Sequence, residues 1–208
     1  MDVQITPLTT QSPSGVTIPN TLMHREPRST RLMIMLPGRG YTCEHPVMYY
    51  VRAMALTHGY EVLSLQYGFQ VAQREMSREE LPVLRQEIQQ AVQKARERRY
   101  DRFCIVGKSL GTPLAVELAT SLSPENVSLI LLTPVNNAAQ HVGHIRTLGI
   151  IGTADPFYDA EAINHTPPSV QWHVFNGLDH ALEPQNDWHA SLAALLEIIS
   201  ACQSFIAG

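Results

Sequence analysis

The stretch Gly107-Lys108-Ser109-Leu110-Gly111 constrains the fold of this chain more than any other part of the sequence. It follows the apolar run FCIV at residues 103–106 and precedes a segment with apolar residues at helical spacing, so it predicts a strand, a sharp turn and a helix. A Gly-x-Ser-x-Gly turn in that setting is typical of a nucleophile elbow, where a serine stands at the apex with its oxygen outward. The pentapeptide alone also occurs by chance, so the rest of the chain has to supply the partners of an activated serine.

Short apolar runs and helical patterns alternate along most of the chain. Strands are predicted at residues 3–7, 16–24, 31–36, 61–67, 103–106, 127–133, 147–152 and 170–175. Helices are predicted at residues 45–58, from about 77 to about 98, after the elbow, and from 186 or 187 toward the C-terminus. This alternation predicts an α/β fold with a largely parallel sheet and helices on both faces. Active sites in such sheets form where the strands end, at their carboxyl edge.

Three of these strand ends carry the residue types of nucleophilic catalysis. A serine hydroxyl needs a base to take its proton, and the base needs a carboxylate to hold its tautomer. Ser109 follows the strand at 103–106, Asp155 follows the strand at 147–152, and His180 follows the strand at 170–175. The sequence therefore predicts a nucleophile, an acid and a base in the order Ser, Asp, His.

Other acids and bases fit these roles less well. Asp159 lies deeper in its loop than Asp155, and Asp179 adjoins His180 and is expected to cap its turn. No Asp or Glu occurs between Glu125 and Asp155, so an acid after the preceding strand is excluded. The competing histidines lie in a loop, in a strand and in the last helix: His165, His173 and His189.

The chain resembles the α/β-hydrolase family through its motifs GKSLG, GTADPF and GLDHAL, from the LMIMLPGRG strand and loop to the final helix. The resemblance implies one α/β-hydrolase domain over residues 1–208, with a mostly parallel sheet of about seven or eight strands and an antiparallel start. It also implies hydrolysis through a covalent acyl-enzyme, with Ser109 as nucleophile, Asp155 as the orienting acid and His180 as general base.

The same resemblance implies an oxyanion hole made of two backbone N–H groups. One comes from Leu110, the residue after the nucleophile. The other comes from the loop Pro37-Gly38-Arg39-Gly40, where we favour Arg39 and keep Gly40 as the alternative.

The segment between the strands at 127–133 and 147–152 is short, and a lid is inserted there in many α/β-hydrolases. Residues 134–146 leave no room for a lid domain, so an open site for small acyl groups is expected. Aromatic and apolar residues at or just past strand ends are the candidates for its wall: Tyr41, Tyr67, Phe69, Phe157 and Leu182.

Composition and short motifs exclude several other classes of protein. A net charge of −4 argues against nucleic-acid and membrane-surface binding. The N-terminus does not match a signal peptide, and no apolar run reaches the roughly 20 residues of a membrane span. Three cysteines suggest reduced thiols in a cytoplasm. A phosphate loop would need glycine at Arg102, and His141 and His144 have no third ligand, so neither a cofactor nor a metal is expected.

The sequence thus predicts a serine hydrolase of the carboxylesterase type, acting on a small-molecule ester or thioester. A thioesterase or a peptidase would use the same residues, and these alternatives stay open. A non-catalytic interaction module on a hydrolase scaffold is the alternative of a different class.

Overall fold

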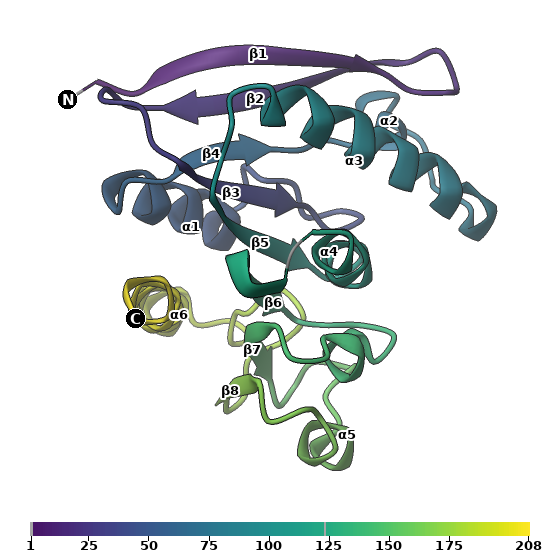
Figure 1. The fold of residues 1–208 in the computed structure, drawn as a ribbon. Coiled ribbons are helices and arrows are strands. Elements are labelled where there is room, and N and C mark those ends of the chain that lie inside the picture. The colour runs from purple at the N-terminus through teal and green to yellow at the C-terminus, as the bar shows by residue number, and fades with distance from the viewer. Residues whose placement is uncertain (1, 123) are drawn as a thin grey trace.

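The protein folds around one eight-stranded sheet with the strand order β1-β2-β4-β3-β5-β6-β7-β8 (Figure 1). The structure, a computed structural model, describes residues 2–122 and 124–208. The strands are β1 (Gln4–Gln11), β2 (Thr17–His24), β3 (Arg31–Leu36), β4 (Glu61–Ser64), β5 (Arg102–Lys108), β6 (Val127–Leu132), β7 (Arg146–Gly152) and β8 (Val170–Phe175). The α-helices are α1 (Pro46–Thr57), α2 (Gly68–Val71), α3 (Leu81–Arg96), α4 (Gly111–Thr120), α5 (Ala160–Asn164) and α6 (Trp188–Ala207).

The sheet is antiparallel only at its start. β2 pairs antiparallel with β1 and with β4, whereas β4, β3, β5, β6, β7 and β8 run parallel to one another. This arrangement confirms the predicted α/β-hydrolase fold, a mostly parallel sheet with helices on both faces. Because the parallel strands share one direction, their carboxyl ends meet along a single edge.

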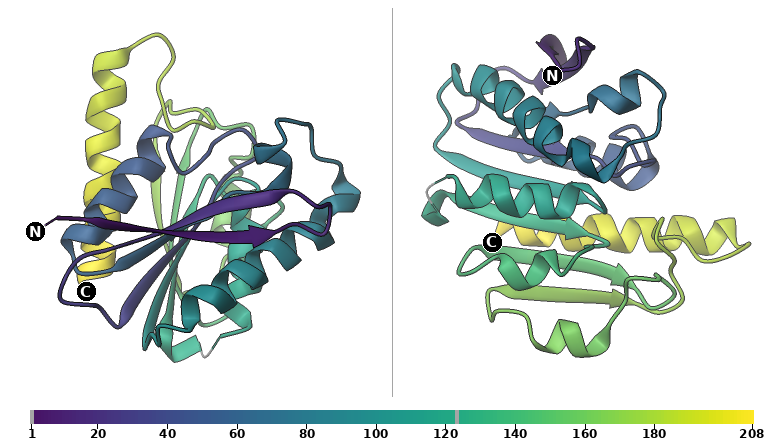
Figure 2. Two further views of the ribbon diagram at one scale, coloured as in Figure 1. Left: turned by 90° about the horizontal axis from the view of Figure 1, so that it is seen from above. Right: turned by 90° about the vertical axis from the view of Figure 1, so that its right-hand side faces the viewer.

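Helices cover both faces of the sheet, with α3 and α4 on one face and α1 and α6 on the other (Figure 2). Successive side chains of a strand point to opposite faces. Leu32 and Ile34 of β3 therefore belong to the core layer under α3 and α4, and Met33 and Met35 belong to the layer under α1 and α6. The second layer also holds all three cysteines, which are free and buried: Cys43, Cys104 and Cys202.

The predicted and observed elements differ mainly at their ends. The helix expected from Ser77 begins at Leu81 as an α-helix, because residues Arg78–Glu80 form a 3-10 turn and Pro82 occupies the first helical turn. The strand predicted at 61–67 ends at Ser64, and the chain then enters the short helix α2, which the sequence pattern did not indicate. The short helix α5 after β7 was likewise not predicted.

Helix α6 corrects the prediction that no segment has the length and hydropathy of a membrane span. The helix is 20 residues long, and an 18-residue window within it has a mean hydropathy of 1.7, with 17% of the window buried. Its C-terminal half packs on the sheet through Ile198 and Cys202, while its N-terminal end projects beyond the body (Figure 2) and exposes Trp188 and Leu192. One such helix is weak evidence for a membrane span, because length and composition alone also select helices of water-soluble proteins.

Candidate active site

The turn between β5 and α4 places Ser109 at the carboxyl edge of the sheet in a strained conformation. Ser109 has a φ of 50°, in the left-handed region that serine rarely adopts. Its N–H donates to the carbonyl of Leu132 on β6 (3.0 Å), and its carbonyl accepts the N–H of Thr112 (2.8 Å). These bonds hold the strained turn between a neighbouring strand and the first turn of α4. Strain that the surrounding structure maintains is typical of functional sites.

The two glycines of the motif are required by close packing on either side of the turn. A Cβ atom on Gly107 would lie 2.5 Å from the carbonyl oxygen of Gly111. A Cβ atom on Gly111 would lie 2.3 Å from the carbonyl oxygen of Leu36 on β3. Both distances are far below van der Waals contact, so a side chain at either position would push α4 away from the sheet.

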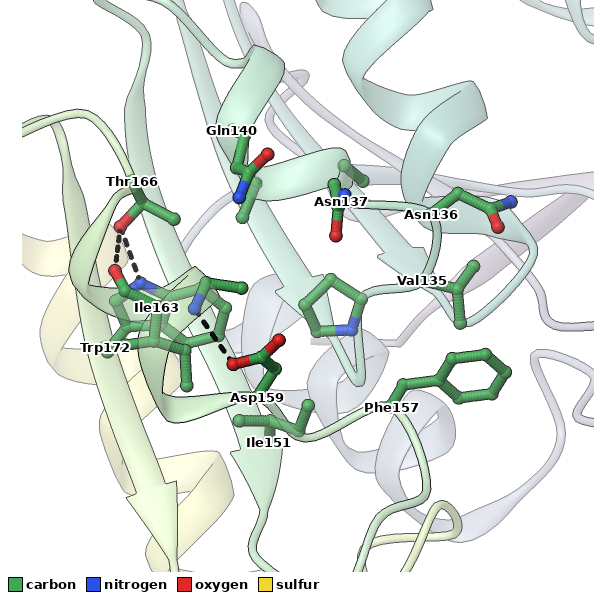
Figure 3. A pocket seen from close by; sticks show the side chains of 14 residues that line it. Val135, Asn136, Asn137, Gln140, Ile151, Phe157, Asp159, Ile163, Thr166 and Trp172 are labelled. Atoms are coloured by element: carbon green, nitrogen blue, oxygen red, sulfur yellow. Dashed lines mark hydrogen bonds between the residues drawn. The ribbon is translucent and has the colours of Figure 1, made fainter.

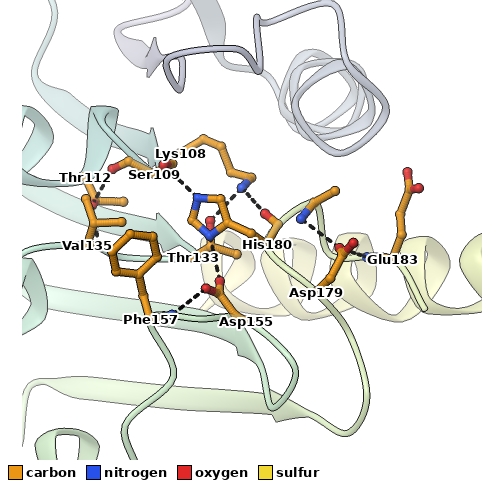
Figure 4. Close-up of polar contacts among 11 residues, drawn as sticks. Lys108, Ser109, Thr112, Thr133, Val135, Asp155, Phe157, Asp179, His180 and Glu183 are labelled. Atoms are coloured by element: carbon orange, nitrogen blue, oxygen red, sulfur yellow. Dashed lines mark hydrogen bonds and ion pairs between the residues drawn. The ribbon is translucent and has the colours of Figure 1, made fainter. Parts of the chain in front are cut away.

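The structure brings the three residues predicted as nucleophile, base and acid together (Figure 4). His180 Nε2 lies 2.8 Å from Ser109 Oγ, and His180 Nδ1 lies 2.8 Å from Asp155 Oδ2. A carboxylate accepts hydrogen bonds, so in the tautomer that this contact favours Nδ1 carries the proton and donates to buried Asp155, and Nε2 is free to accept the serine proton. The other carboxylate oxygen, Oδ1, accepts the backbone N–H of Phe157 (2.8 Å). The arrangement can take a proton from Ser109 and stabilise the resulting imidazolium.

The competing acids have other tasks. Asp159 accepts the N–H groups of Glu161 and Ala162 at the start of α5 (2.9 and 3.0 Å). Asp179 accepts the N–H of Ala181 (2.8 Å), which is the turn-capping role expected of it. Neither carboxylate contacts the histidine ring in the described structure.

The glycine-rich loop after β3 lies beside the nucleophile. A Cβ atom on Gly38 would lie 3.4 Å from Ser109 Cβ, and the Gly38 carbonyl accepts the side-chain amide of Gln70 (2.8 Å). Leu110 follows Ser109 directly and begins the turn into α4. The loop and Leu110 thus lie next to Ser109, while the role of Leu110 as one oxyanion donor and the choice between Arg39 and Gly40 as the other stay predictions.

A small cavity of about 80 Å³ opens beside the site, between the loop after β6 and helix α5 (Figure 3). Its apolar lining includes Ile151, Ile163 and Trp172, and Val135 and Phe157 form the side nearest the serine. The fourteen lining residues are Pro134, Val135, Asn136, Asn137, Ala138, Ala139, Gln140, Ile151, Phe157, Asp159, Ala162, Ile163, Thr166 and Trp172.

Among the five predicted wall residues, only Phe157 lines this cavity. The structure corrects the prediction for Tyr67, Phe69 and Leu182, which are 0%, 4% and 1% exposed and belong to the core. Tyr67 instead supports the glycine-rich loop, because its hydroxyl donates to the carbonyl of Pro37 (3.2 Å). Tyr41 is partly buried, its hydroxyl accepts the N–H of Val47 (3.2 Å), and burial raises its pKa to about 12.

Lys108 is the residue near the site whose contacts the sequence did not indicate. Its side chain is 1% exposed, and its ammonium donates to Thr133 Oγ1 and to the backbone carbonyl of His180, each at 2.6 Å (Figure 4). The Nζ atom also lies 4.8 Å from the centre of the Tyr41 ring. Burial lowers the pKa of Lys108 to about 8, although the charges of Asp155 and Asp179 act in the opposite direction.

No group of three or more His, Cys, Asp or Glu side chains that could hold a metal ion occurs within residues 2–122 and 124–208. His141 and His144 lie in the segment between β6 and β7, and neither is one of the three hydrogen-bonded residues.

The sheet, the strained serine turn and the hydrogen-bonded Ser-His-Asp arrangement define the class of α/β hydrolases. A family model described as an alpha/beta hydrolase domain matches residues 29–207. The chain therefore belongs to the alpha/beta hydrolase family, and this membership supports hydrolase activity. No curated protein matches the sequence.

Solved structures share the fold over nearly the whole chain. A serine hydrolase without lid from Xanthomonas campestris gives a TM-score of 0.72 at 16% identity, covering 100% of this chain and 95% of that chain. A dienelactone hydrolase from Anabaena variabilis gives 0.76 at 17% identity, covering 100% and 98%. An esterase from Pyrococcus furiosus gives 0.71 at 14% identity, covering 98% and 90%. At identities this low, the likeness extends to the fold and not to the substrate.

Proposed function

We propose that this protein is a serine hydrolase that cleaves a carboxylic ester with a small acyl group through an acyl-enzyme. The observation that carries the proposal is the chain of two 2.8 Å contacts linking Ser109 Oγ, the His180 ring and Asp155. A Gly-x-Ser-x-Gly turn that occurred by chance would not be expected to lie beside a histidine that is itself hydrogen-bonded to a carboxylate in the orientation that proton transfer needs.

The reaction follows from the direction of these bonds. Ser109 Oγ attacks the ester carbonyl carbon while its proton moves to His180 Nε2, and Asp155 stabilises the imidazolium through Nδ1. The carbonyl oxygen becomes an oxyanion, which the N–H of Leu110 and an N–H of the glycine-rich loop stabilise. The C–O bond to the alcohol then breaks, and the alcohol leaves with the proton from Nε2. A water molecule, deprotonated by the same histidine, releases the acid and restores the serine.

The size and position of the neighbouring cavity support the proposal that the acyl group of the substrate is small. It is bounded by Val135, whose N–H donates to Thr112 Oγ1 (3.2 Å) in the turn after the serine. It is also bounded by Phe157, whose ring centre lies 5.3 Å from that of His180. In the described chain the connection from β6 to β7 forms the short 3-10 turn Ala138–His141 as its one regular element, which supports the proposal of a site without a lid. A volume of about 80 Å³ suits a short acyl chain better than a long lipid.

A fluorophosphonate probe tests the enzyme proposal directly, because it phosphonylates only an activated serine. We expect labelling of the wild-type protein at Ser109, no labelling of Ser109→Ala, and at least about 100-fold slower labelling of His180→Ala. Ser128→Ala is the matched control for a serine outside the site and should be labelled normally. Absence of labelling in the folded wild type, or labelling that His180→Ala leaves unchanged, would leave only the interaction-module alternative.

Substrate series then separate the chemistries that share the site. Acetyl, butyryl and longer p-nitrophenyl esters should be compared with the matching acyl-CoA thioesters and with an amide. We expect the highest kcat/KM on short esters. Equal rates on acetyl and long-chain esters would contradict the small-substrate proposal, and a strong preference for the thioester or the amide would replace the ester with that substrate.

A further inference from the structure

Lys108 is a buried cation whose contacts are all with neutral groups. Its ammonium nitrogen lies 2.6 Å from the Thr133 hydroxyl oxygen, 2.6 Å from the His180 carbonyl oxygen and 4.8 Å from the centre of the Tyr41 ring. No ion pair within the described part of the chain includes Lys108. Burying a charge without a direct counter-ion is costly, so a lysine at this position requires an explanation other than stability.

Thr133, which receives one of these hydrogen bonds, is itself held in an unusual conformation. It follows β6 with a φ of 47°, which is rare for a β-branched residue, and it is 0% exposed. Its N–H donates to the carbonyl of Ile150 on β7 (2.7 Å), so the neighbouring strand maintains this conformation. The Thr133 hydroxyl is thus held in a fixed position, where it accepts a hydrogen bond from the ammonium of Lys108.

The contact with His180 closes a ring of bonds around the site. Lys108 is covalently joined to Ser109, the Ser109 hydroxyl meets the His180 ring, and the His180 backbone carbonyl returns to Lys108 (Figure 4). His180 lies in the loop after β8, the last strand of the sheet, whereas Lys108 ends β5, which is separated from β8 by β6 and β7. The lysine therefore ties the loop of the base to the strand of the nucleophile.

We propose that Lys108 is a positioning residue that holds the backbone of His180 so that its ring stays within proton-transfer distance of Ser109. The inference rests on the proposed function of Ser109 and His180, and it adds a residue that neither the motif nor the Ser-His-Asp arrangement includes. It explains why a charge is buried where an apolar side chain would pack at lower cost. Displacing a reacting group by about 1 Å is enough to lower a rate by two orders of magnitude.

The first test is the variant Lys108→Met, which keeps the length and apolar stem of the side chain and removes the donors. We expect kcat and the rate of fluorophosphonate labelling to fall by about 10- to 100-fold, with KM changed by less than about 3-fold. Lys94→Met, at the other lysine of the chain and exposed on α3, is the matched control and should behave as wild type. Thr133→Val removes only the supporting hydroxyl, so its effect should be smaller and should disappear in the Lys108→Met background.

A spectroscopic readout separates positioning from general stability. The proton between His180 Nδ1 and Asp155 should give a strongly downfield NMR resonance in the wild type, and that resonance should broaden or vanish in Lys108→Met. The melting temperature of the variant should stay within about 4 °C of wild type or rise. The proposal is overturned if the folded Lys108→Met variant is labelled as fast as the wild type and keeps the resonance unchanged. It is also overturned if the variant loses no more rate than it loses folded protein.

This design also distinguishes the proposal from the proposed function. If the wild type is not labelled, the esterase proposal fails, and the NMR comparison then decides the positioning role alone. A resonance lost in Lys108→Met supports the role, and one that persists refutes it.

Discussion

Replacing Lys108 with methionine should change how the stability of the protein depends on pH. Burial lowers the pKa of Lys108 from its ordinary value of 10.5 to about 8 in the folded protein. Each pH unit of difference is equivalent to about 1.4 kcal/mol, so the buried charge costs the folded state about 3 kcal/mol at neutral pH.

The direction of the effect follows from proton binding. Below pH 8 both the folded and the unfolded chain carry the proton on Lys108, and the folded state bears the full cost. Between pH 8 and 10.5 the folded protein has lost the proton while the unfolded chain still binds it, so the free energy of unfolding rises with pH. Above 10.5 neither state is protonated and the contribution is constant.

The assay is urea unfolding of the wild type and Lys108→Met from pH 7 to pH 11. The free energy of unfolding of the wild type minus that of the variant should rise by about 3 kcal/mol over this range. Other titrating groups occur in both proteins and cancel in the subtraction. At pH 7 the variant should be about as stable as the wild type, because the relief of the buried charge offsets two lost hydrogen bonds of about 1 to 2 kcal/mol each.

A matched control isolates the burial. The same subtraction with Lys94→Met should stay flat with pH, because that side chain is exposed on α3. A difference for Lys108→Met that is flat, or that falls as pH rises, would refute the argument that desolvation of this ammonium opposes folding.

Three further predictions follow from distances in the site. Asp155→Asn should lower kcat by about 10³- to 10⁴-fold in steady-state assays while the circular dichroism spectrum stays unchanged, because an amide N–H turned toward Nδ1 favours the wrong tautomer. Gly111→Ala should lower the free energy of unfolding by at least about 2 kcal/mol, since the new Cβ would lie 2.3 Å from the carbonyl of Leu36; Gly40→Ala, with no atom within 4 Å, should not. Ile163→Trp should fill the cavity and lower kcat/KM on butyrate esters at least about 10-fold more than on acetate esters, and equal losses would place the acyl group elsewhere.

The fold and the three hydrogen-bonded residues were within reach of the sequence because both depend on patterns that are short-ranged. Alternating strand and helix signals predict a parallel sheet, and a parallel sheet places every strand end at one edge. Ser109, Asp155 and His180 each follow one of these strand ends, and they are therefore brought to the same edge of the sheet. Of the two glycines beside Ser109, Gly107 is a local requirement, because its Cβ would meet Gly111 within the same turn. The requirement for Gly111 is tertiary, because its Cβ would meet the carbonyl of Leu36 on β3.

The walls of the site were not predictable in the same way. Tyr67 and Phe69 lie just past β4, where the sequence suggested a cavity wall, but helix α2 begins there and turns both rings into the core. The cavity beside the serine lies between the loop after β6 and α5, a helix too short to leave a clear hydrophobic period. Which side of a ring faces solvent depends on the elements packed over it, and those elements come from distant parts of the chain.

The contacts of Lys108 are the clearest example of a feature that the sequence could not predict. In the sequence it is the variable residue of a Gly-x-Ser-x-Gly motif, and its charge suggests an exposed side chain. In the folded protein it is 1% exposed and touches Thr133 and His180, which are separated from it by 25 and 72 positions. Local patterns in the chain identify the residues that reach the carboxyl edge of the sheet, because hydrophobic periodicity marks the strands and the helices between them make the strands parallel. What those residues contact at the edge follows from tertiary packing, because contacts between loops of different strands depend on packing that no local pattern contains.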